Sequence, residues 1–301
     1  MAGFFADTNE LSNQLVNPCT LTSPGTSWAS TAPLTSILTT PLEERAVTTR
    51  LGAADNPVVI EMEWLYPVDI AYGGLFHANL WQESFFRMEA WLDSGRTQKV
   101  TDTRLPNGRD RRVIPGLYDP KTLQPGYSSW LRGGLPNEDF RRFTTNIHAN
   151  VPLCRARVIR WSLWGGAYKP DGTDDTVYRF GLGWAGNGLA ITRHAPGSSD
   201  GVKPNTELIE QPGGALWAEP GLRKRTAVID LAAIQPTLRD KLFAAAHRAG
   251  NEKPIVWLPN VASPEACFWY GGLFRLVGDY QHKYLPPIWA ALTLNLLEWR
   301  E

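Results

Sequence analysis

The sequence predicts a mostly β protein with one flanking helix, in which an N-terminal lead-in is followed by two β regions. Several segments alternate apolar and polar residues and are rich in β-branched and aromatic side chains, as half-buried strands are. Clusters of the 27 Gly and 23 Pro residues between them mark turns and loops. The length of 301 residues allows one large β domain or two ordinary ones, and either can bury a substantial core.

Residues 1–45 form the predicted lead-in, an N-terminal arm. The segment is rich in Ser, Thr, Pro and Asn, a composition typical of extended or irregular chain. Two interpretations remain open: a surface loop, and an arm that laces onto a neighbouring subunit.

Residues 46–190 form the first predicted β region. Gly73 and Gly74 interrupt an apolar strand and indicate a bulge or tight bend. Three Arg residues between positions 155 and 160 change face along a second strand, which indicates another bulge. Residues 94–140 are turn-rich and are expected to form a long loop excursion. Strands are expected over residues 46–51, 58–64, 68–77, 85–91, 154–164 and 176–184.

Residues 191–301 form the second predicted β region and contain the predicted helix. Pro236 suits a first helical turn, apolar residues recur after it at helical spacing, and Gly250 is a natural C-terminal stop. Residues 194–222 contain four Gly-containing turn dipeptides and are expected to be irregular. Strands are expected over residues 223–231, 254–259, 267–277 and 288–299.

Charge and cysteine content argue against several classes of function. Thirty basic and 30 acidic residues give a formal net charge of zero, so no positive field supports nucleic-acid recognition. The three Cys residues are far apart in the sequence, which fits neither a disulfide framework nor a zinc site and suits a reducing compartment. Of the 13 Trp residues, most are expected in strands and cores and the rest on contact surfaces.

The sequence also predicts neither a signal peptide near residue 1 nor a membrane span near residue 290. The first ten residues lack the basic run and apolar core of a signal peptide. The apolar stretch 288–297 is too short to span a bilayer. We therefore expect synthesis in a cytosol and no membrane insertion.

The reactive residue types suggest no catalytic constellation. The five His residues, at positions 77, 148, 194, 247 and 282, are not paired at helical spacing and lie in no known metal motif. Residues 181–186 match the pattern G-x-G-x-x-G, but no helix is predicted after them, and a dinucleotide site needs that helix N-terminus. The sequence thus predicts no catalytic, cofactor-binding or metal-ligating residue and no cofactor.

The charged clusters have structural interpretations. Asp171, Asp174 and Asp175 resemble the start of a calcium loop, but the later Gly and Glu positions are absent, so a solvated turn is favoured. Glu61 and Glu63 alternate along a strand and are expected to face solvent. Whether two carboxylates meet as sugar hydrolysis requires stays open. The Arg clusters at 109–112 and 223–225 are interpreted as subunit contacts or loop charges.

Two stretches of the first β region resemble a galactose-binding-like, discoidin-type jelly roll. The first stretch has a strand ending in Trp64, then residues 68–79, in which Asn79 falls at the Asn of the family pattern, then Phe-Arg-Met-Glu-Ala-Trp. The second, residues 155–184, resembles the returning strands, with a Pro-Asp-Gly turn and Tyr-Arg-Phe-Gly-Leu-Gly-Trp from Tyr178. The resemblance implies a jelly-roll β-sandwich over residues 46–190 that can bind glycans through loop aromatics.

The order of elements in residues 191–301 resembles the tail-tube-like β fold of distal and minor tail proteins of tailed bacteriophages. A basic turn is followed by a strand, an amphipathic helix, a Pro-Ile-Val-Trp strand and a closing strand. The resemblance implies a non-enzymatic component of a tail tip or baseplate, which forms a ring and connects the tail tube to tip proteins. Its implied partners are copies of itself and other tail proteins such as tube and hub, and its implied location is the virion tail, after the host cytoplasm.

Two further functions remain open. One is a carbohydrate-binding or receptor-binding tail protein that recognises host-surface glycans through exposed aromatic side chains. The other is an accessory or catalytic domain of a glycoside hydrolase, which would need two facing carboxylates in a cleft.

Overall fold

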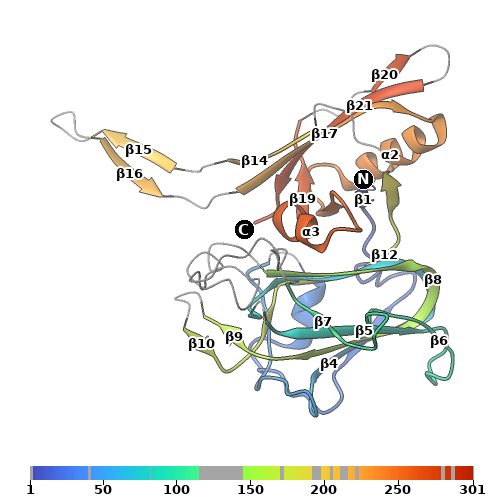
Figure 1. The fold of residues 1–301 in the computed structure, drawn as a ribbon, viewed down its shortest axis with the longest axis vertical. Helices are drawn as coiled ribbons and strands as arrows, with labels where there is room; N and C mark the ends of the chain where they lie inside the picture. Colours follow the sequence, from blue (N-terminus) through green and yellow to red (C-terminus); the bar gives the residue numbers. More distant parts are fainter. Residues whose placement is uncertain are drawn as a thin grey trace. The chain divides into compact units, whose positions relative to one another are not determined.

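The computed structural model is built mainly from strands, and it describes residues 3–39, 42–81, 83–114, 145–169, 173–191, 198–203, 206–210, 216–220, 224–278, 282–285 and 289–300. The predicted mostly β class is confirmed. The chain divides into two compact units (Figure 1). Unit 1 comprises Met1–Asp7, Leu189–Ala262 and Trp269–Arg300, and unit 2 comprises Thr8–Gly188 and Ser263–Phe268.

Unit 2 is built on a sheet whose two central strands are unusually long. β4 (Val58–Ala78) has 21 residues and β8 (Thr145–Trp164) has 20. The sheet runs β12-β4-β8-β5-β6, with β2 also paired to β4 and β7 to β5, while β9 pairs with β10 and β11 with β3. The remaining elements are β2 (Cys19–Thr22), η1 (Leu34–Leu38), β3 (Ala46–Val47), β5 (Phe85–Trp91), β6 (Lys99–Asp102), β7 (Arg111–Arg112), β9 (Ala167–Tyr168), β10 (Asp174–Asp175), β11 (Arg179–Phe180) and β12 (Leu182–Gly186).

Bulges divide the β4–β8 ladder into two halves that pack face to face. The register shifts at three places along β4, and bulges bend strands. The first half of β4 also pairs with β2 and the second half with β12. A Cβ on Gly73, in the second half, would lie 3.0 Å from Trp161 Cζ2, in the first half, and 2.5 Å from Met88 Sδ of β5, which pairs with Trp161. Unit 2 is therefore a two-layered sandwich whose core includes the fully buried Trp161.

The close approach at Gly73 gives a stability prediction. Gly73→Val is expected to lower the free energy of unfolding of unit 2 by about 2–3 kcal/mol, because the added methyl groups have no space beside Met88 and Trp161. Urea denaturation followed by Trp fluorescence measures the change. The exposed Gly95→Val serves as the control and should change the midpoint little; equal losses in the two variants would contradict this packing.

The N-terminal segment is not a separate arm, and the prediction for residues 1–45 is wrong in this respect. β1 (Gly3–Ala6) lies between β13 (Leu189–Ile191) and β18 (Ile255–Leu258) in the sheet of unit 1, with all four of its residues buried. β2 pairs Cys19 with Trp64, and η1 buries Ile37 in unit 2. The polar composition was misleading because short strands here are stabilised by pairing with distant parts of the chain.

Unit 1 contains an eight-stranded antiparallel sheet. Its order is β13-β1-β18-β19-β21-β17-β14, with β20 paired to β21. Since β1 and β13 are neighbours in the sheet, most of unit 2 is inserted in the sequence between these two strands. The elements are β13 (Leu189–Ile191), β14 (Ser199–Lys203), β15 (Thr206–Glu210), β16 (Leu216–Pro220), β17 (Lys224–Ile234), β18 (Ile255–Leu258), β19 (Gly272–Leu276), β20 (His282–Leu285) and β21 (Trp289–Glu298).

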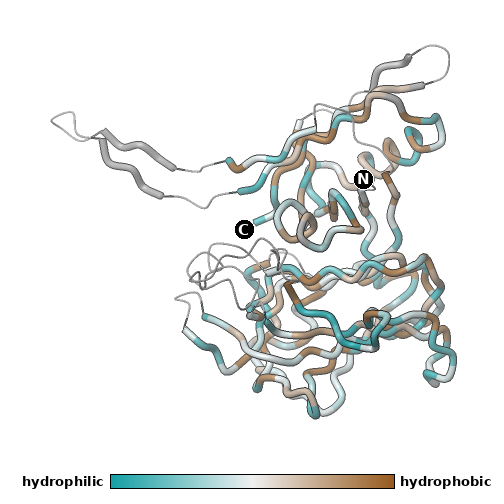
Figure 2. The backbone as a smooth tube through the Cα atoms, in the orientation of Figure 1, coloured by the Kyte–Doolittle hydropathy of each residue, from teal (hydrophilic) through white to brown (hydrophobic). Residues whose placement is uncertain are grey.

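Helix α2 (Pro236–Ala249) confirms the predicted helix and covers one face of this sheet. Pro236 begins the helix, and Gly250 ends it with φ 53°. The buried stripe of α2 includes Leu242 and Ala245, which join a core with Leu292 and other inward-facing residues of β17 and β21. Hydrophobic and hydrophilic stretches alternate along these elements (Figure 2). Among the described residues, no helix is long and apolar enough to cross a membrane.

A buried ion pair fastens β17 to β21. Glu298 accepts hydrogen bonds from Arg225 N and Nε, both at 2.8 Å, and Arg300 Nε lies 3.3 Å away. Burial alone would raise the pKa of Glu298, but the charge and hydrogen bonds of Arg225 and the charge of Arg300 hold this pKa below its usual value. Arg225 also donates to the carbonyl groups of Trp269 and Gly271, so the pair joins three segments of unit 1.

This pair predicts a pH-dependent contribution to stability. Because the folded pKa of Glu298 is lowered, its contribution is present above the usual Glu pKa of about 4.3 and is lost as the pH falls through the folded value. Glu298→Gln is expected to cost about 1–3 kcal/mol at pH 7, and the difference from the unmodified chain should shrink on acidification. Denaturation curves between pH 7 and pH 3 measure it, and a difference that grows on acidification would contradict the pairing.

Two other expectations for residues 191–301 are wrong. The predicted strand 267–277 begins as helix α3 (Pro264–Tyr270), with Ser263 Oγ accepting from Ala266 N, and only Gly272–Leu276 form a strand. Residues 194–222 are not wholly irregular, since they contain β14, β15 and β16. Their Gly and Pro residues suggested loops, but cross-strand pairing outweighs the local preference.

Candidate functional site

An open strand edge and a two-stranded ribbon distinguish unit 1. β14 is the last strand of the eight-stranded sheet, and all five of its residues are exposed, Val202 among them. The ladder that pairs Lys203 with Lys224 is followed by a separate ladder between β15 and β16, which begins by pairing Thr206 with Pro220. Figure 1 shows β15 and β16 extending beyond β14 and β17, away from α2. We call β15 and β16 the ribbon.

The ribbon has only its own two strands as sheet partners among the described residues. Its register is continuous from Thr206 opposite Pro220 to Glu210 opposite Leu216. A two-stranded hairpin is at best marginally stable alone in water. In the described part of the chain, the ribbon and β14 therefore each present a strand edge to which a further strand could be added.

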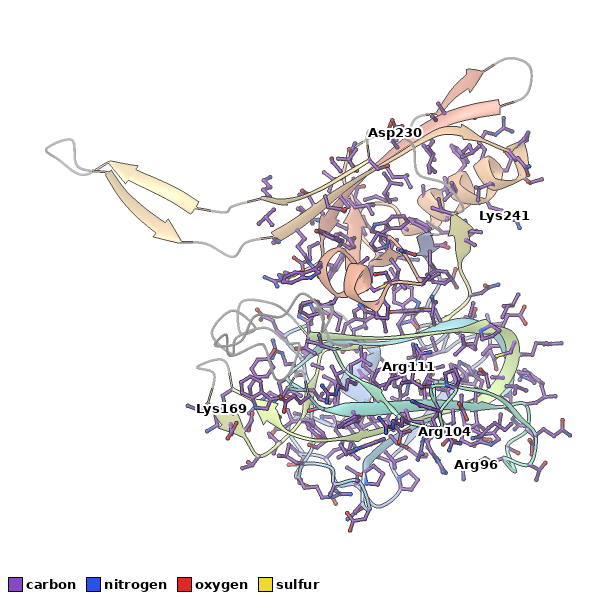
Figure 3. The ribbon with its side chains drawn as sticks, viewed as in Figure 1. Arg96, Arg104, Arg111, Lys169, Asp230 and Lys241 are labelled. Carbon is purple, nitrogen blue, oxygen red and sulfur yellow. The ribbon has the colours of Figure 1, made fainter. Side chains whose placement is uncertain are left out.

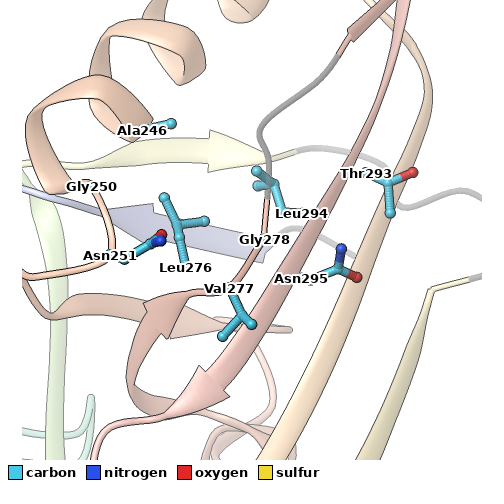
Figure 4. A pocket seen from close by; sticks show the side chains of 9 residues that line it. All are labelled: Ala246, Gly250, Asn251, Leu276, Val277, Gly278, Thr293, Leu294 and Asn295. Atoms are coloured by element: carbon cyan, nitrogen blue, oxygen red, sulfur yellow. The ribbon is translucent and has the colours of Figure 1, made fainter.

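A shallow groove lies at the C-terminal end of α2 (Figure 4). Its volume is about 200 Å³, and it is lined by α2, by the turn after α2 and by β19 and β21. Asn251, Thr293 and Asn295 are the polar side chains that line it. Its described lining offers no charged side chain for a ligand.

Unit 2 has a polar cluster where β4 meets β9, β10 and β11. Asn79 is buried, and its Nδ2 donates to Tyr168 O at 3.2 Å, Asp175 Oδ2 at 3.3 Å and Val177 O at 3.0 Å. Its Oδ1 accepts from Arg179 N at 2.7 Å. Asp175 is also buried and accepts from Arg179 Nε at 3.2 Å. The hydrogen-bonding capacity of Asn79 is thus used to position the β9–β10 hairpin.

Tyr168 of this hairpin forms an aromatic pair with Trp81, which follows β4. Their ring centroids are 5.1 Å apart, and both side chains are half-buried. Trp81 Nε1 donates to Asp174 Oδ1 at 3.1 Å, and Lys169 lies next in the exposed chain (Figure 3). Burial lowers the pKa of Arg45, which interacts with Tyr168. We call Trp81, Tyr168 and Asp174 the aromatic end of unit 2.

The outer face of β4, β8 and β5 carries an ion-pair network, which corrects the prediction for Glu61. Glu61 is buried, not solvent-facing, because it accepts hydrogen bonds from Arg160 of β8 and Arg96 of the β5–β6 turn. Glu89 lies 3.7 Å from Arg104. Both carboxylates are engaged by cations, as in a structural network.

The His residues are dispersed. His77 is buried with φ 54°, and its backbone N–H donates to Asn146 Oδ1 at 3.2 Å. His148 Nδ1 is 2.6 Å from Tyr72 Oη. His247 is exposed in the last turn of α2, His282 lies in β20, and His194 lies outside the described residues. The structure brings none of the described His residues into a group with other metal-ligating side chains.

The other sequence motifs have structural places. Residues 181–186 lie mostly in β12, after which the chain continues into β13 and not into a helix. Asp174 and Asp175 form β10, and Asp171 lies outside the described residues. Arg111 Nε donates to Thr103 O at 2.7 Å. In the second Arg cluster, Arg225 binds Glu298, and position 223 is outside the described residues.

Sequence reasoning missed both the ribbon and the aromatic end. The ribbon could have been found from two short apolar-polar runs, 206–210 and 216–220, on either side of Pro212-Gly-Gly. Trp81 follows the Asn of the resembled pattern by two residues, but no local signal links it to Tyr168. The isolated β-bridge between Leu80 and Ala167 brings Trp81 next to Tyr168.

No family model matches the chain, and no curated protein matches it. Three similar solved structures each have a TM-score of 0.34. The lectin binding domain of Lectinolysin complexed with Lewis b is 9% identical, over 60% of this chain and 96% of that chain. CBM32-3 from a family 31 glycoside hydrolase from Clostridium perfringens is 11% identical, over 56% of this chain and 91% of that chain. GH31 CBM32-2 bound to GalNAc is 6% identical, over 57% of this chain and 98% of that chain. A TM-score of 0.34 is too low to transfer a fold or a ligand to this chain.

Proposed function

We propose that this chain is a non-enzymatic structural protein that self-associates through the ribbon and the open edge of β14. The observation that carries the proposal is the ribbon itself, a two-stranded sheet that pairs with no third strand among the described residues. Such a ribbon gains stability when another chain covers it or adds a strand to it. The buried carboxylates of Glu61, Asp175 and Glu298 are engaged by Arg side chains, which favours a structural role for them.

The sheet topology favours a head-to-tail arrangement of copies. β14 and β13 occupy the two ends of the seven-stranded path through this sheet, with β20 paired to β21 off the path, so the two edges are different surfaces. When different surfaces of identical chains meet, the contact is heterologous and generates a ring if the rotation closes. A ring is therefore the expected assembly.

The finer proposal is that the ring belongs to a bacteriophage tail tip. Its support is the order of strand, helix, strand and closing strand in residues 224–298, which resembles distal and minor tail proteins. In this proposal the neighbours are tail-tube and hub proteins, and the location is the virion tail after synthesis in the host cytoplasm.

Mass photometry and negative-stain imaging of the purified full chain test the proposal. We expect a discrete oligomer with ring-shaped particles at micromolar concentration. A monomer at every accessible concentration would overturn self-association. An oligomer that binds no purified tail component would leave self-association standing and overturn the tail assignment.

Glycan binding at the aromatic end is the second candidate function. Trp81, Tyr168 and the exposed Asp174 combine aromatic rings with a carboxylate acceptor, which suits the apolar and hydroxyl faces of a sugar. A glycan array is expected to give hits that Trp81→Ala removes and that Trp164→Ala, at a half-buried Trp of the same unit, retains. No hits, or equal loss in both variants, would exclude this function.

A further inference from the structure

The ion-pair network on the outer face of β4, β8 and β5 carries a layer of basic side chains. The pairing registers place Glu61 opposite Arg160, and Arg160 opposite Glu89, so these residues share one face of the sheet. Five bases lie within ion-pair distance of these two carboxylates: Arg87, Arg96, Lys99, Arg104 and Arg160. We call these five bases the cationic face.

The bases of the cationic face are more exposed than the acids with which they pair. The side chains of the five bases are 28–37% exposed, whereas those of Glu61 and Glu89 are 2% and 11% exposed. Asp102 and Asp110, which pair with Arg104 and Arg87, are each 24% exposed. A partner that approaches from solvent therefore meets ammonium and guanidinium groups before it meets carboxylates.

The segment that contributes four of these five bases has a surplus of positive charge. Residues 85–112 contain seven basic and four acidic residues, Asp93 of the β5–β6 turn included, in a chain whose formal net charge is zero. Outside this segment, Arg160 is balanced by Glu61, and Arg157 lies 3.8 Å from Glu63. The neighbouring strands thus cancel their own charges, and the surplus of three positive charges remains on residues 85–112.

The segment that forms the ribbon has the opposite charge. Residues 204–222 contain three acidic residues, Glu207, Glu210 and Glu219, and no Lys, Arg or His. The ladder between β15 and β16 places Glu207 directly opposite Glu219. Like charges that are directly opposite destabilise an antiparallel pair. A cationic partner therefore stabilises the ribbon more than a neutral partner does.

We propose that the ribbon of one copy lies against the cationic face of the next copy. The three Glu residues of the ribbon match the three surplus positive charges of residues 85–112, and complementary charge favours and orients such a contact. The ribbon and the cationic face are different surfaces, so the contact is head-to-tail and compatible with a ring. This inference rests on the proposed function, because it names the surface of the neighbouring copy that receives the ribbon.

A nucleic acid is the competing occupant of the cationic face. Binding to a phosphate backbone depends on the number of phosphates that Lys and Arg neutralise. Here the paired carboxylates of the network already neutralise part of the face, and the whole chain has no net charge to attract a polyanion. An acidic protein segment with three charges therefore suits the face better than a nucleic acid does.

A charge swap in the full chain tests the contact. Glu207→Lys with Glu219→Lys reverses the charge of the ribbon, and Lys99→Glu with Arg104→Glu reverses that of the cationic face. Each pair of substitutions alone should raise the dissociation constant of the oligomer at least about tenfold, and all four together should return it to near the native value. Sedimentation velocity at low salt measures the constants. Leu105→Ser, next to Arg104 in the sequence, changes no charge and is the control.

A neutral variant of the face, Lys99→Gln with Arg104→Gln, is measured as well. Charge reversal places new acids beside Glu89, so thermal unfolding must show that the reversed variant is folded. If it does not fold, the neutral variant decides, and it should also weaken self-association, by a smaller factor than the reversal.

Recovery of self-association in the variant with all four reversals supports the contact. Weakening in both reversed variants without recovery, or native affinity in the folded neutral variant, overturns it. Binding of a short labelled DNA duplex that the face variants lose, without recovery of self-association, also overturns it. If ribbon removal weakens self-association and the face variants do not, the contact is wrong and the proposed function stands. If ribbon removal has no effect, the proposed function itself is wrong.

Discussion

Removal of the ribbon is expected to weaken self-association and leave both units folded. Lys203 and Lys224 are directly opposite each other, so residues 204–223 can be replaced by Asn-Gly, the preferred two-residue hairpin turn. The eight-stranded sheet and the core under α2 contain no ribbon residue. The dissociation constant should rise at least about tenfold, or 1.4 kcal/mol. Sedimentation velocity across a concentration series measures the change.

The control for ribbon removal is a substitution of an exposed apolar residue outside the ribbon. Leu105→Ser alters an exposed apolar residue of unit 2 and should leave sedimentation unchanged. Circular dichroism and thermal unfolding show whether the shortened chain is folded. A shortened chain that is folded and still forms the same oligomers would contradict the proposed role of the ribbon.

Asn79→Ala is expected to destabilise unit 2 by about 2–4 kcal/mol. The substitution removes four hydrogen bonds at a buried position and leaves Arg179 N and Asp175 Oδ2 without this partner. It should also loosen the β9–β10 hairpin that carries Tyr168. Urea denaturation measures the stability, and hydrogen exchange of residues 167–175 measures the loosening.

Asn251→Ala is the matched control for Asn79→Ala. Asn251 is exposed after α2, and surface substitutions of this kind usually change stability by less than about 0.5 kcal/mol. Similar effects of the two substitutions, or unchanged exchange near Tyr168 in Asn79→Ala, would contradict the role assigned to the Asn79 cluster.

Local patterns predicted those elements that local forces determine. β5 (Phe85–Trp91) and α2 were predicted within one residue, because alternation, Pro236 and Gly250 specify them without help from distant residues. α3 had a local signal, Ser263 before Pro264, that the apolar run after it concealed. In contrast, β1 depends on pairing with residues 189–191 and 256–258, and no local pattern contains that information.

The candidate site was harder to predict for the same reason. Asn79 was noted from a family pattern, but its partners Asp175 and Arg179 are about 100 positions away. Glu61 alternates like a surface residue, and only the arrival of Arg96 and Arg160 buries it. The ribbon was hidden because Gly and Pro suggest loops, whereas antiparallel pairing of residues 206–210 with 216–220 makes strands.

The mass of the purified native chain in solution tests the central claim most directly. Since an unpartnered ribbon and an open strand edge are unstable surfaces, we expect light scattering to give a mass that is a whole multiple of 33.5 kDa and greater than one chain. A mass of 33.5 kDa at all concentrations, with amides of residues 206–220 protected from hydrogen exchange, would show that the ribbon is stable alone and would contradict the account.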